Sequence, residues 1–260
     1  MNILVTGHDG FIGRNIVPSL EAEGHIVSLF EWGSEFPDLY ACDIQQVIHL
    51  GAISSTTEKN VEKIMTQNYQ FSVDLLCLCE TLGIDFQYSS SASVYGLNKV
   101  FTETSPVDPR TPYSWSKYMF ERYVQSRNRD IKVQGFRYFN VHGPHEEHKG
   151  TQASPHHQFT KQAKETGIIK VFENSNNYFR DFVPVSSVVD AHKQFLTVDN
   201  SGLWNVGTGT ATSFQQIAND ISDEFKATIT YIPMPDNLKH SYQTYTCADT
   251  TNFNKAYANV

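Results

Sequence analysis

The sequence predicts an α/β protein with a doubly wound parallel sheet and a smaller C-terminal lobe. Short apolar runs typical of buried strands alternate with longer stretches of helical periodicity. The first run ends in a turn with three glycines, and a helical pattern follows directly. After Asn140 this alternation gives way to a polar stretch rich in histidine and glycine, which indicates a second architecture.

The strands and helices of the sheet lie mostly in the first half of the chain. The expected strands are 2–6, 25–30, 47–50, 85–90 and 133–139, and the expected helices are 11–23, 61–82 and 113–126. Further strands are expected at 182–185 and 203–206. We therefore assign residues 1–141, with 182–207 returning to them, to the sheet domain, and residues 142–181 and 208–260 to the second lobe.

Composition limits the classes of function. With 40% hydrophobic and 18% charged residues, the chain suits a soluble globular protein that has a sizeable core. No apolar run is long enough to span a bilayer, and no leader pattern precedes the first strand. The net charge of −8, without a basic stripe, argues against nucleic acid and anionic membranes as partners. We expect a cytoplasmic protein with four reduced cysteines: Cys42, Cys77, Cys79 and Cys247.

Five histidines gather between residues 142 and 157. They are His142, His145, His148, His156 and His157. Because Pro144 interrupts the run, the first three do not share one helical face. We expect a polar loop beside a ligand cleft rather than a metal site.

The glycine-rich turn after the first strand predicts dinucleotide binding. A tight turn can require φ > 0, a pyrophosphate must approach the backbone closely, and the helix must pack against the strand. Free N–H groups at the helix start then meet the phosphates. The alternative is an ordinary structural turn. The predicted segment comprises Gly7, Gly10, Phe11, Ile12 and Gly13.

Glu31 follows the second strand, where a carboxylate can bind ribose hydroxyls. A carboxylate would repel a 2′-phosphate, and no arginine or lysine follows closely, so NAD is favoured over NADP. An ordinary surface acid is the alternative.

A tyrosine and a lysine four residues apart indicate redox chemistry on a hydroxyl group. The spacing of Tyr113 and Lys117 puts both on one helical face. Tyrosine is a poor base at neutral pH, and a nearby ammonium favours its phenolate. A serine cluster at 89–93 ends the preceding strand, and Ser91 is our choice for the hydroxyl that bonds the reacting oxygen. A serine-rich turn is the alternative.

Together these residues resemble the extended short-chain dehydrogenase/reductase family, whose members act on nucleotide-sugars. Further motifs are similar to its ADP-L-glycero-D-manno-heptose 6-epimerases. They are Ser54–Glu58, Asn68–Gln70, Gly135–Pro144, His148–Gly150, Arg180–Val183, Asn205–Gly209, Ser213–Gln215, Pro233–Lys239 and Tyr242–Gln243. The resemblance implies a Rossmann-type dinucleotide-binding domain, a substrate-binding lobe and a homo-oligomer.

The resemblance also implies roles for residues. A hydride would leave C6 of the heptose and return to its other face, with Tyr113 as one base and Lys149 as the second. Cofactor contacts would include Leu50, Gly51, Ala52, Ser54, Asn68, Lys117 and Val141. Substrate contacts would be Ser91, Asn140, Thr151, Gln158, Phe172, Arg180 and Tyr242.

The chain departs from the family in three places. The segment 32–46 is too short for the strand and helix that the family has there, and Asp43-Ile44 is the expected remnant of an acidic adenine contact. Gln158 stands where the family has histidine. The family's last helix is expected to be missing.

Other functions remain open from the sequence. The alternatives are a UDP-hexose 4-epimerase, a net reductase, or a catalytically silent dinucleotide-binding protein. Lys149 argues against the first, because a 4-epimerase needs no second base. A 4,6-dehydratase is disfavoured because Ala92-Ser93-Val94 supplies no carboxylate.

Overall fold

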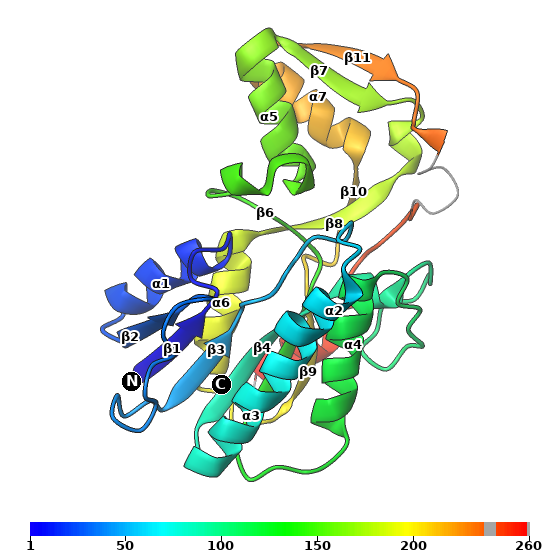
Figure 1. The fold of residues 1–260 in the computed structure, drawn as a ribbon. Helices are drawn as coiled ribbons and strands as arrows, with labels where there is room; N and C mark the ends of the chain where they lie inside the picture. Colours follow the sequence, from blue (N-terminus) through cyan, green and yellow to red (C-terminus); the bar gives the residue numbers. More distant parts are fainter. Residues whose placement is uncertain (237–242, 259–260) are drawn as a thin grey trace.

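A parallel sheet of six strands forms the larger part of the molecule (Figure 1). The computed structural model describes residues 1–236 and 243–258. The strand order is β2-β1-β3-β4-β5-β9, and every neighbouring pair is parallel. The strands are β1 (Asn2–Thr6), β2 (Ile26–Phe30), β3 (Gln46–His49), β4 (Asp85–Ser91), β5 (Val133–Tyr138) and β9 (Gly202–Val206). The predicted fold class is confirmed.

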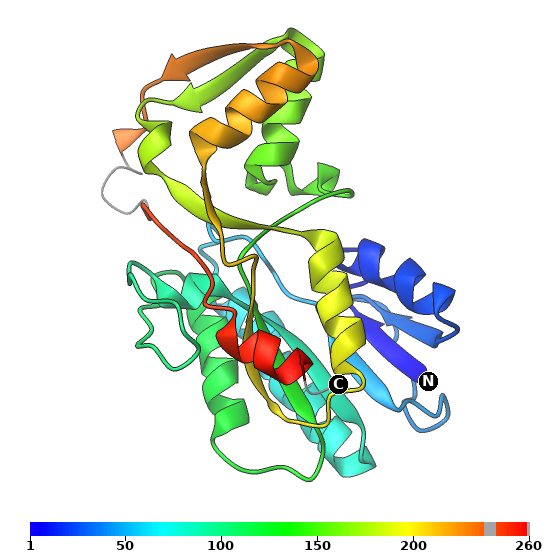
Figure 2. The same cartoon turned by 180° about the vertical axis from the view of Figure 1, so that it is seen from behind.

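Helices cover both faces of this sheet, as a doubly wound fold requires (Figures 1 and 2). One face carries α1 (Gly13–Ala22) and α6 (Val185–Phe195). The other carries α4 (Pro112–Gln125) and a continuous helical run made of α2 (Val61–Ile64), η1 (Met65–Gln70) and α3 (Phe71–Leu82). The predicted helix at 61–82 is therefore confirmed, and its η1 segment is π-helical.

Burial on both faces explains why β1 is an uninterrupted apolar run. Ile3 and Val5 pack in the cluster under α1, and Leu4 packs in the cluster on the opposite face, together with Leu75 and Leu76 of α3. Successive side chains of a strand point to opposite faces, so each face receives alternate residues. The two clusters pack α1 and α3 against opposite faces of the sheet.

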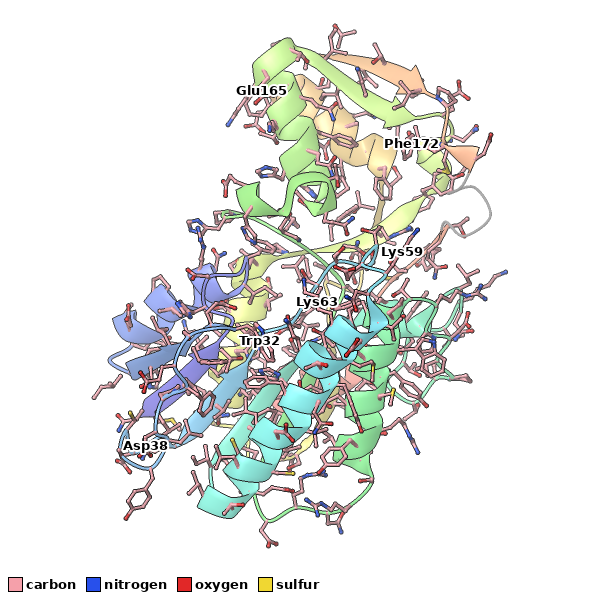
Figure 3. The ribbon with its side chains drawn as sticks, in the orientation of Figure 1. Trp32, Asp38, Lys59, Lys63, Glu165 and Phe172 are labelled. Carbon is pink, nitrogen blue, oxygen red and sulfur yellow. The ribbon has the colours of Figure 1, made fainter. Side chains whose placement is uncertain are left out.

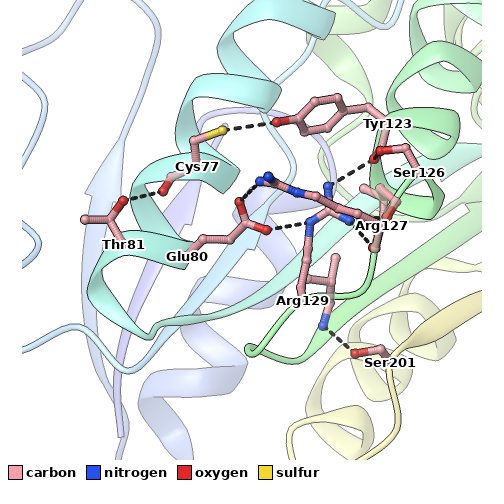
Figure 4. Close-up of polar contacts among 10 residues, drawn as sticks. Cys77, Glu80, Thr81, Tyr123, Ser126, Arg127, Arg129 and Ser201 are labelled. Atoms are coloured by element: carbon pink, nitrogen blue, oxygen red, sulfur yellow. Dashed lines mark hydrogen bonds and ion pairs between the residues drawn. The ribbon is translucent and has the colours of Figure 1, made fainter.

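An ion-pair cluster ties the far ends of α3 and α4 together (Figure 4). The Glu80 carboxylate of α3 lies 2.6 Å from Nη2 of Arg127 and 2.8 Å from Nε of Arg129, both just after α4. Cys77 and the Tyr123 hydroxyl add a contact at 3.2 Å. These contacts fix the position of α4, which carries Tyr113 and Lys117.

The second lobe has its own small core. Two helices, α5 (Pro155–Thr166) and α7 (Phe214–Phe225), pack on the parallel pair β7 (Ile168–Phe172) and β11 (Thr228–Ile232). A three-stranded sheet connects this lobe to the main sheet and contains β6 (Asn140–His142), β8 (Phe179–Pro184) and β10 (Ala211–Ser213). Short 3₁₀ segments are η2 (Ala92–Tyr95), η3 (Glu147–Gln152) and η4 (Ser175–Asn177).

One detail of the expected division differs in the structure. The strand expected at 182–185 belongs to the connecting sheet as β8, so only α6 and β9 of the 182–207 segment return to the main sheet. A further helix, α9 (Thr251–Tyr257), lies against the sheet domain, where Phe253 stacks on Phe195 with centroids 5.1 Å apart. That the family's last helix is missing stays a prediction. The rest of the division into two lobes stays a prediction.

The short connection between β2 and β3 runs to the wrong end of the sheet for an adenine contact. The Asp43 carbonyl oxygen accepts a hydrogen bond from Asn2 Nδ2 at 3.1 Å, and Ile44 is buried in the core. Asn2 begins β1, whereas the glycine turn follows the end of that strand. Figure 3 shows Asp38 of this loop at the same distant end. The expectation that Asp43-Ile44 lies near the adenine was therefore wrong.

All four cysteines are free thiols. Within the residues that the structure describes, no helix is both long enough and apolar enough to cross a membrane.

Candidate active site

The glycine turn is packed so tightly that side chains are excluded. Gly7 has φ +73°, and a Cβ atom there would lie 2.6 Å from the Cα of Gly51, which follows β3. A Cβ on Gly13 would collide with the Gly7 carbonyl oxygen. The ends of β1 and β3, where the strand order reverses direction, are thus held against each other and against α1. Open α/β sheets bind ligands at this reversal point.

The start of α1 is suited to bind phosphate. Within the described residues, the N–H groups of Phe11, Ile12 and Gly13 make no hydrogen bond to the protein. Free N–H groups and the helix dipole at such a terminus favour an anion. The glycine cradle and these donors therefore fit the pyrophosphate of a dinucleotide.

A cavity of about 590 Å³ opens above this turn, at the carboxyl ends of the strands. It brings together most of the predicted site residues from both halves of the chain. They are Gly7, Gly10, Phe11, Ile12, Gly13, Glu31, Leu50, Gly51, Ala52, Ser54, Ser91, Tyr113, Lys117, Asn140, Val141 and Lys149. The sequence analysis gave no individual contact to the other lining residues, although Thr56, Ser89, Ser90, Tyr138, Phe139 and His148 lie in motifs that it quoted. Gln152, Ala153, Ser154 and Pro155 also line the cavity and were not singled out. Most of these flank predicted residues.

Asn68 lies behind the cavity wall rather than on it. Its Oδ1 accepts from the Ile53 N–H at 2.8 Å, and its Nδ2 donates to the Ile53 carbonyl at 3.0 Å and to Ser116 Oγ at 3.2 Å. Asn68 thereby ties the loop after β3 to α4. A direct cofactor contact stays a prediction.

Four predicted substrate contacts, Thr151, Gln158, Phe172 and Arg180, do not line the cavity in this structure. Gln158 donates to the carbonyls of Thr151 and Ala153, so its amide serves the local fold of η3 and α5. Arg180 is buried, donates to its neighbour Phe179 and lies over the Phe214 ring. Phe172 is at the end of β7 in the second lobe (Figure 3). The fifth, Tyr242, lies outside the described residues.

The start of α4 fixes the tyrosine and lysine. Thr111 caps the helix in a reciprocal box with Ser114, and Pro112 occupies the first helical position. One turn later Lys117, almost fully buried, donates from Nζ to the Ser89 carbonyl oxygen at 2.8 Å and to Ser89 Oγ at 3.1 Å. Its Nζ lies 6.0 Å from the centroid of the Tyr113 ring. The cap and the strand end therefore position both groups.

Burial sets the acidity of both groups. It raises the pKa of Tyr113 above its usual value, while the hydrogen bond with Ser91 lowers that pKa. Burial also lowers the pKa of Lys117 to about 8, and nearby Glu121 opposes that change. Tyr113 as the structure shows it is thus a protonated phenol near neutral pH. It needs added positive charge nearby to become a base.

Lys149 reaches the same cavity from η3. Its Nζ lies 4.8 Å from the centroid of the Phe11 ring and 3.8 Å from Oε2 of Glu146. Burial lowers the pKa of Lys149, and Glu146 opposes that change. A lysine with a lowered pKa holds more of the neutral, basic form.

Sequence reasoning missed Glu146, which holds this segment in place. Its carboxylate is fully buried and accepts from the N–H of Gly143 at 3.0 Å, the N–H of Ser154 at 2.6 Å and the Ser154 hydroxyl at 2.7 Å. A single glutamate in a polar loop gives no sequence signal that its carboxylate will be buried and hydrogen-bonded. Glu146 bridges β6 to α5 and places Lys149 at the cavity.

A buried ion pair anchors the strand-end serines. Glu121 of α4 pairs with Arg137 of β5 at 2.7 Å and also accepts from the Ser90 hydroxyl. Arg137 donates in addition to the Tyr95 hydroxyl at 2.9 Å. Because Ser90 directly precedes Ser91, this ion pair fixes the position of Ser91, the candidate catalytic serine, at the end of β4.

Replacing Glu121 with alanine is expected to lower the free energy of unfolding by about 3–5 kcal/mol, because Arg137 would stay buried without its partner. Urea unfolding followed by circular dichroism measures the loss. Glu165→Ala is the matched control, since Glu165 is exposed and pairs with Lys161 at 3.9 Å on the surface; we expect almost no change there. Equal stability of the two variants would contradict the anchoring role.

In the part of the chain that the structure describes, no three histidine, cysteine, aspartate or glutamate side chains come together as potential metal ligands. His142 and His156 instead stack face to face, with ring centroids 3.9 Å apart. Burial, together with the nearby His142, lowers the pKa of His156 to about 4. This pair and Glu146 line a second cavity, and none of the three lines the 590 Å³ cavity.

The fold and the site define a dinucleotide-binding α/β protein with a serine, tyrosine and lysine at the carboxyl ends of the strands. A family model confirms this class. The chain belongs to the NAD dependent epimerase/dehydratase family, whose model matches residues 3–207.

Solved structures of epimerases resemble the chain over its full length. The ADP-L-glycero-D-manno-heptose-6-epimerase of Helicobacter pylori is 26% identical, with a TM-score of 0.87, and the match covers 99% of this chain and 90% of that one. The UDP-glucose 4-epimerase of Thermotoga maritima is 27% identical, with a TM-score of 0.86, and the match covers 98% and 92%. The UDP-glucuronic acid 4-epimerase of Bacillus cereus is 22% identical, covers 100% and 94%, and has a TM-score of 0.83, which shows the shared fold.

Proposed function

We propose that this chain epimerises a nucleotide-diphosphate sugar, with ADP-D-glycero-D-manno-heptose as the substrate and C6 as the inverted centre. The observation that carries the proposal is the presence of Tyr113 and Lys149 on one cavity. Inversion through a ketone needs proton transfer at the same oxygen in two orientations. Two separate bases meet that need. The resemblance to the Helicobacter pylori enzyme supports the heptose as substrate.

In this mechanism each polar group of the chain handles a proton or orients an oxygen. When bound, the oxidised nicotinamide supplies a reversible hydride acceptor and a positive charge. Tyr113 takes the proton of the C6 hydroxyl, Ser91 holds the oxygen, and Lys117 stabilises the phenolate. After the carbonyl group has turned within the cavity, Lys149 returns a proton to the same oxygen from its own side. Loss of a proton from Tyr113 to solvent and uptake of one by Lys149 then restore the starting state, and the reverse reaction exchanges the two roles.

A second candidate is 4-epimerisation of a UDP-hexose. The slightly higher identity to the Thermotoga maritima enzyme favours it. In that reaction Tyr113 alone serves both half-reactions, and Lys149 has no chemical role. Parallel incubations with ADP-D-glycero-D-manno-heptose and UDP-galactose, with products identified by NMR, separate the two. Formation of the L-glycero epimer alone supports our proposal, whereas UDP-glucose alone would replace it.

We further propose NAD rather than NADP as the cofactor. Glu31 lines the cavity, and its carboxylate accepts from the Asp9 N–H at 3.3 Å, beside the glycine turn. A 2′-phosphate placed there would meet this negative charge. Assembly into a homo-oligomer and a cytoplasmic location stay predictions of the resemblance.

Calorimetry is expected to show NAD⁺ binding at least about tenfold more tightly than NADP⁺, because a difference of about 1.4 kcal/mol already gives that factor. Glu31→Gln removes the charge and keeps an acceptor oxygen, so it should narrow the preference mainly by improving NADP⁺ binding. Glu35→Ala, an exposed acid of the next loop, serves as control. Tighter binding of NADP⁺ by the wild type would refute this proposal.

A further inference from the structure

The buried carboxylate of Glu146 lies beside two cavities. Glu146 lines the second cavity, of about 640 Å³, and its ion-pair partner Lys149 lines the 590 Å³ cavity. The Lys149 N–H donates to the Glu146 carbonyl oxygen at 2.9 Å, so the two residues share one turn of the chain at the start of η3. The mechanism above gives a chemical role to Lys149 but none to Glu146.

The hydrogen bonds of Glu146 leave one acceptor site open. A carboxylate offers about four such sites, divided between its two oxygens. Oε1 accepts from the Gly143 N–H and the Ser154 hydroxyl, and Oε2 accepts from the Ser154 N–H. The open site is therefore on Oε2, the oxygen that lies 3.8 Å from Lys149 Nζ. Because Ser154 also caps α5, the carboxylate lies at the positive end of that helix, which favours its charged form.

Opposing effects act on the ammonium group of Lys149. Burial lowers its pKa, because a buried charge loses its hydration. The Glu146 carboxylate raises that pKa, and the face of the Phe11 ring, with its centroid 4.8 Å from Nζ, also attracts a cation. A group that gives a proton in one direction of a reaction and takes one in the other needs access to both of its forms. The charge of Glu146 therefore bears directly on the proposed role of Lys149.

The histidines of the second cavity leave this carboxylate to Lys149 near neutral pH. Burial lowers the pKa of His142 of β6 and of His156 of α5, the latter to about 4. Glu146 opposes both changes, and Asp220 of α7 opposes the second. Both rings are therefore uncharged at pH 7.

Other titratable side chains also surround the pair. Those of the second cavity are Glu147, His157, Lys161, Lys164 and Glu165. Those of the 590 Å³ cavity are Glu31, Tyr113, Lys117, Tyr138 and His148. Among the described residues, none of them forms an ion pair with Glu146 or Lys149. Lys149 is thus the cation that completes the surroundings of the buried carboxylate.

We propose that Glu146 is a positioning residue that holds the balance between the ammonium and amine forms of Lys149. The proposal rests on the proposed function, in which Lys149 is the second base. Without the carboxylate, burial would favour the amine, and Lys149 would hold less of the proton that it returns to the sugar oxygen. Glu146 does not line the 590 Å³ cavity, so it acts through Lys149 and not on the substrate.

Trace acetylation of lysines with acetic anhydride tests this balance without sugar or cofactor. The reagent modifies only the amine form, and mass spectrometry of the peptides gives a titration midpoint for each lysine. We expect Glu146→Gln to move the Lys149 midpoint to lower pH and to raise its labelling below that midpoint several-fold. Local unfolding would expose Lys149 and move the midpoint the other way. Lys161, exposed and paired with Glu165, is the internal control and should titrate as in wild type.

Glu165→Gln is the matched control variant, because it removes a surface carboxylate from a lysine pair and should leave the Lys149 midpoint unchanged. With the sugar substrate, Glu146→Gln should lower kcat several-fold and leave KM nearly unchanged. Should Glu146→Gln not fold, Ser154→Ala keeps the charge and removes one donor from it. The carboxylate then depends more on Lys149, and the Lys149 midpoint should rise.

The labelling separates this proposal from the proposed reaction. A Lys149 midpoint that is unchanged or higher in folded Glu146→Gln, or not raised in Ser154→Ala, would overturn the role of Glu146 whatever the enzyme turns over. A lower midpoint in Glu146→Gln together with wild-type kcat of Lys149→Met would refute the second base alone.

Discussion

Replacing Tyr113 with phenylalanine is expected to lower kcat for epimerisation by roughly 10²–10⁴-fold, the usual contribution of a positioned acid–base group. Tyr113 is half-buried and lines the cavity together with Ser91, and its ring would remain in place after loss of one oxygen atom. Dinucleotide affinity should therefore be unchanged. Steady-state rates and calorimetry on the same preparation measure both quantities.

A tyrosine of the same helix provides the control. Tyr123→Phe removes a hydroxyl whose contact is Cys77, at the far end of α4, and should leave kcat as in wild type. If Tyr113→Phe keeps wild-type turnover, Tyr113 is not the base and the mechanism fails.

Lys149→Met should also lower kcat by roughly 10²–10⁴-fold if Lys149 is the second base. The side chain keeps much of its contact with the Phe11 ring but loses the proton carrier. In a 4-epimerase, which uses Tyr113 for both half-reactions, the same change would leave kcat nearly unaltered. This variant therefore separates the two candidate functions by a large effect.

The change Lys149→Met also removes the cation beside the buried Glu146 carboxylate. Among the ion pairs of the described residues, Lys149 is the only cationic partner of Glu146. A melting curve shows whether the variant still folds, and Lys161→Met, an exposed lysine of the same lobe, controls for loss of charge. The combination of Tyr113→Phe and Lys149→Met should abolish turnover while cofactor remains bound. Activity of this double variant near the wild-type rate would contradict both assignments.

The fold could be predicted because its determinants are local. A strand such as β1 that is buried on both faces is apolar throughout, and Gly7, Gly10 and Gly13 mark the turn that directly follows it. The four-residue spacing of Tyr113 and Lys117 fixes their common face once α4 is helical. Each of these signals lies within a few residues of the chain.

The remaining features depend on contacts between distant segments. Glu121 of α4 contacts Ser90 of β4 and Arg137 of β5. Nothing near Glu121 in the sequence indicates these two partners. The path of the loop after β2 places Asp43 beside Asn2, at the opposite end of β1 from the glycine turn, and no local signal indicates that path. Arg180 lies in a motif that resembles the family's. Such a motif does not determine whether the Arg180 side chain reaches the 590 Å³ cavity.

The most direct test is to incubate the protein with ADP-D-glycero-D-manno-heptose in D₂O and to follow the C6 proton by NMR. Direct return of the hydride predicts the L-glycero epimer with no deuterium at C6. Deuterium at C6 of the epimer would show exchange with solvent, and would contradict the oxidation and reduction at this carbon that the site residues are proposed to perform.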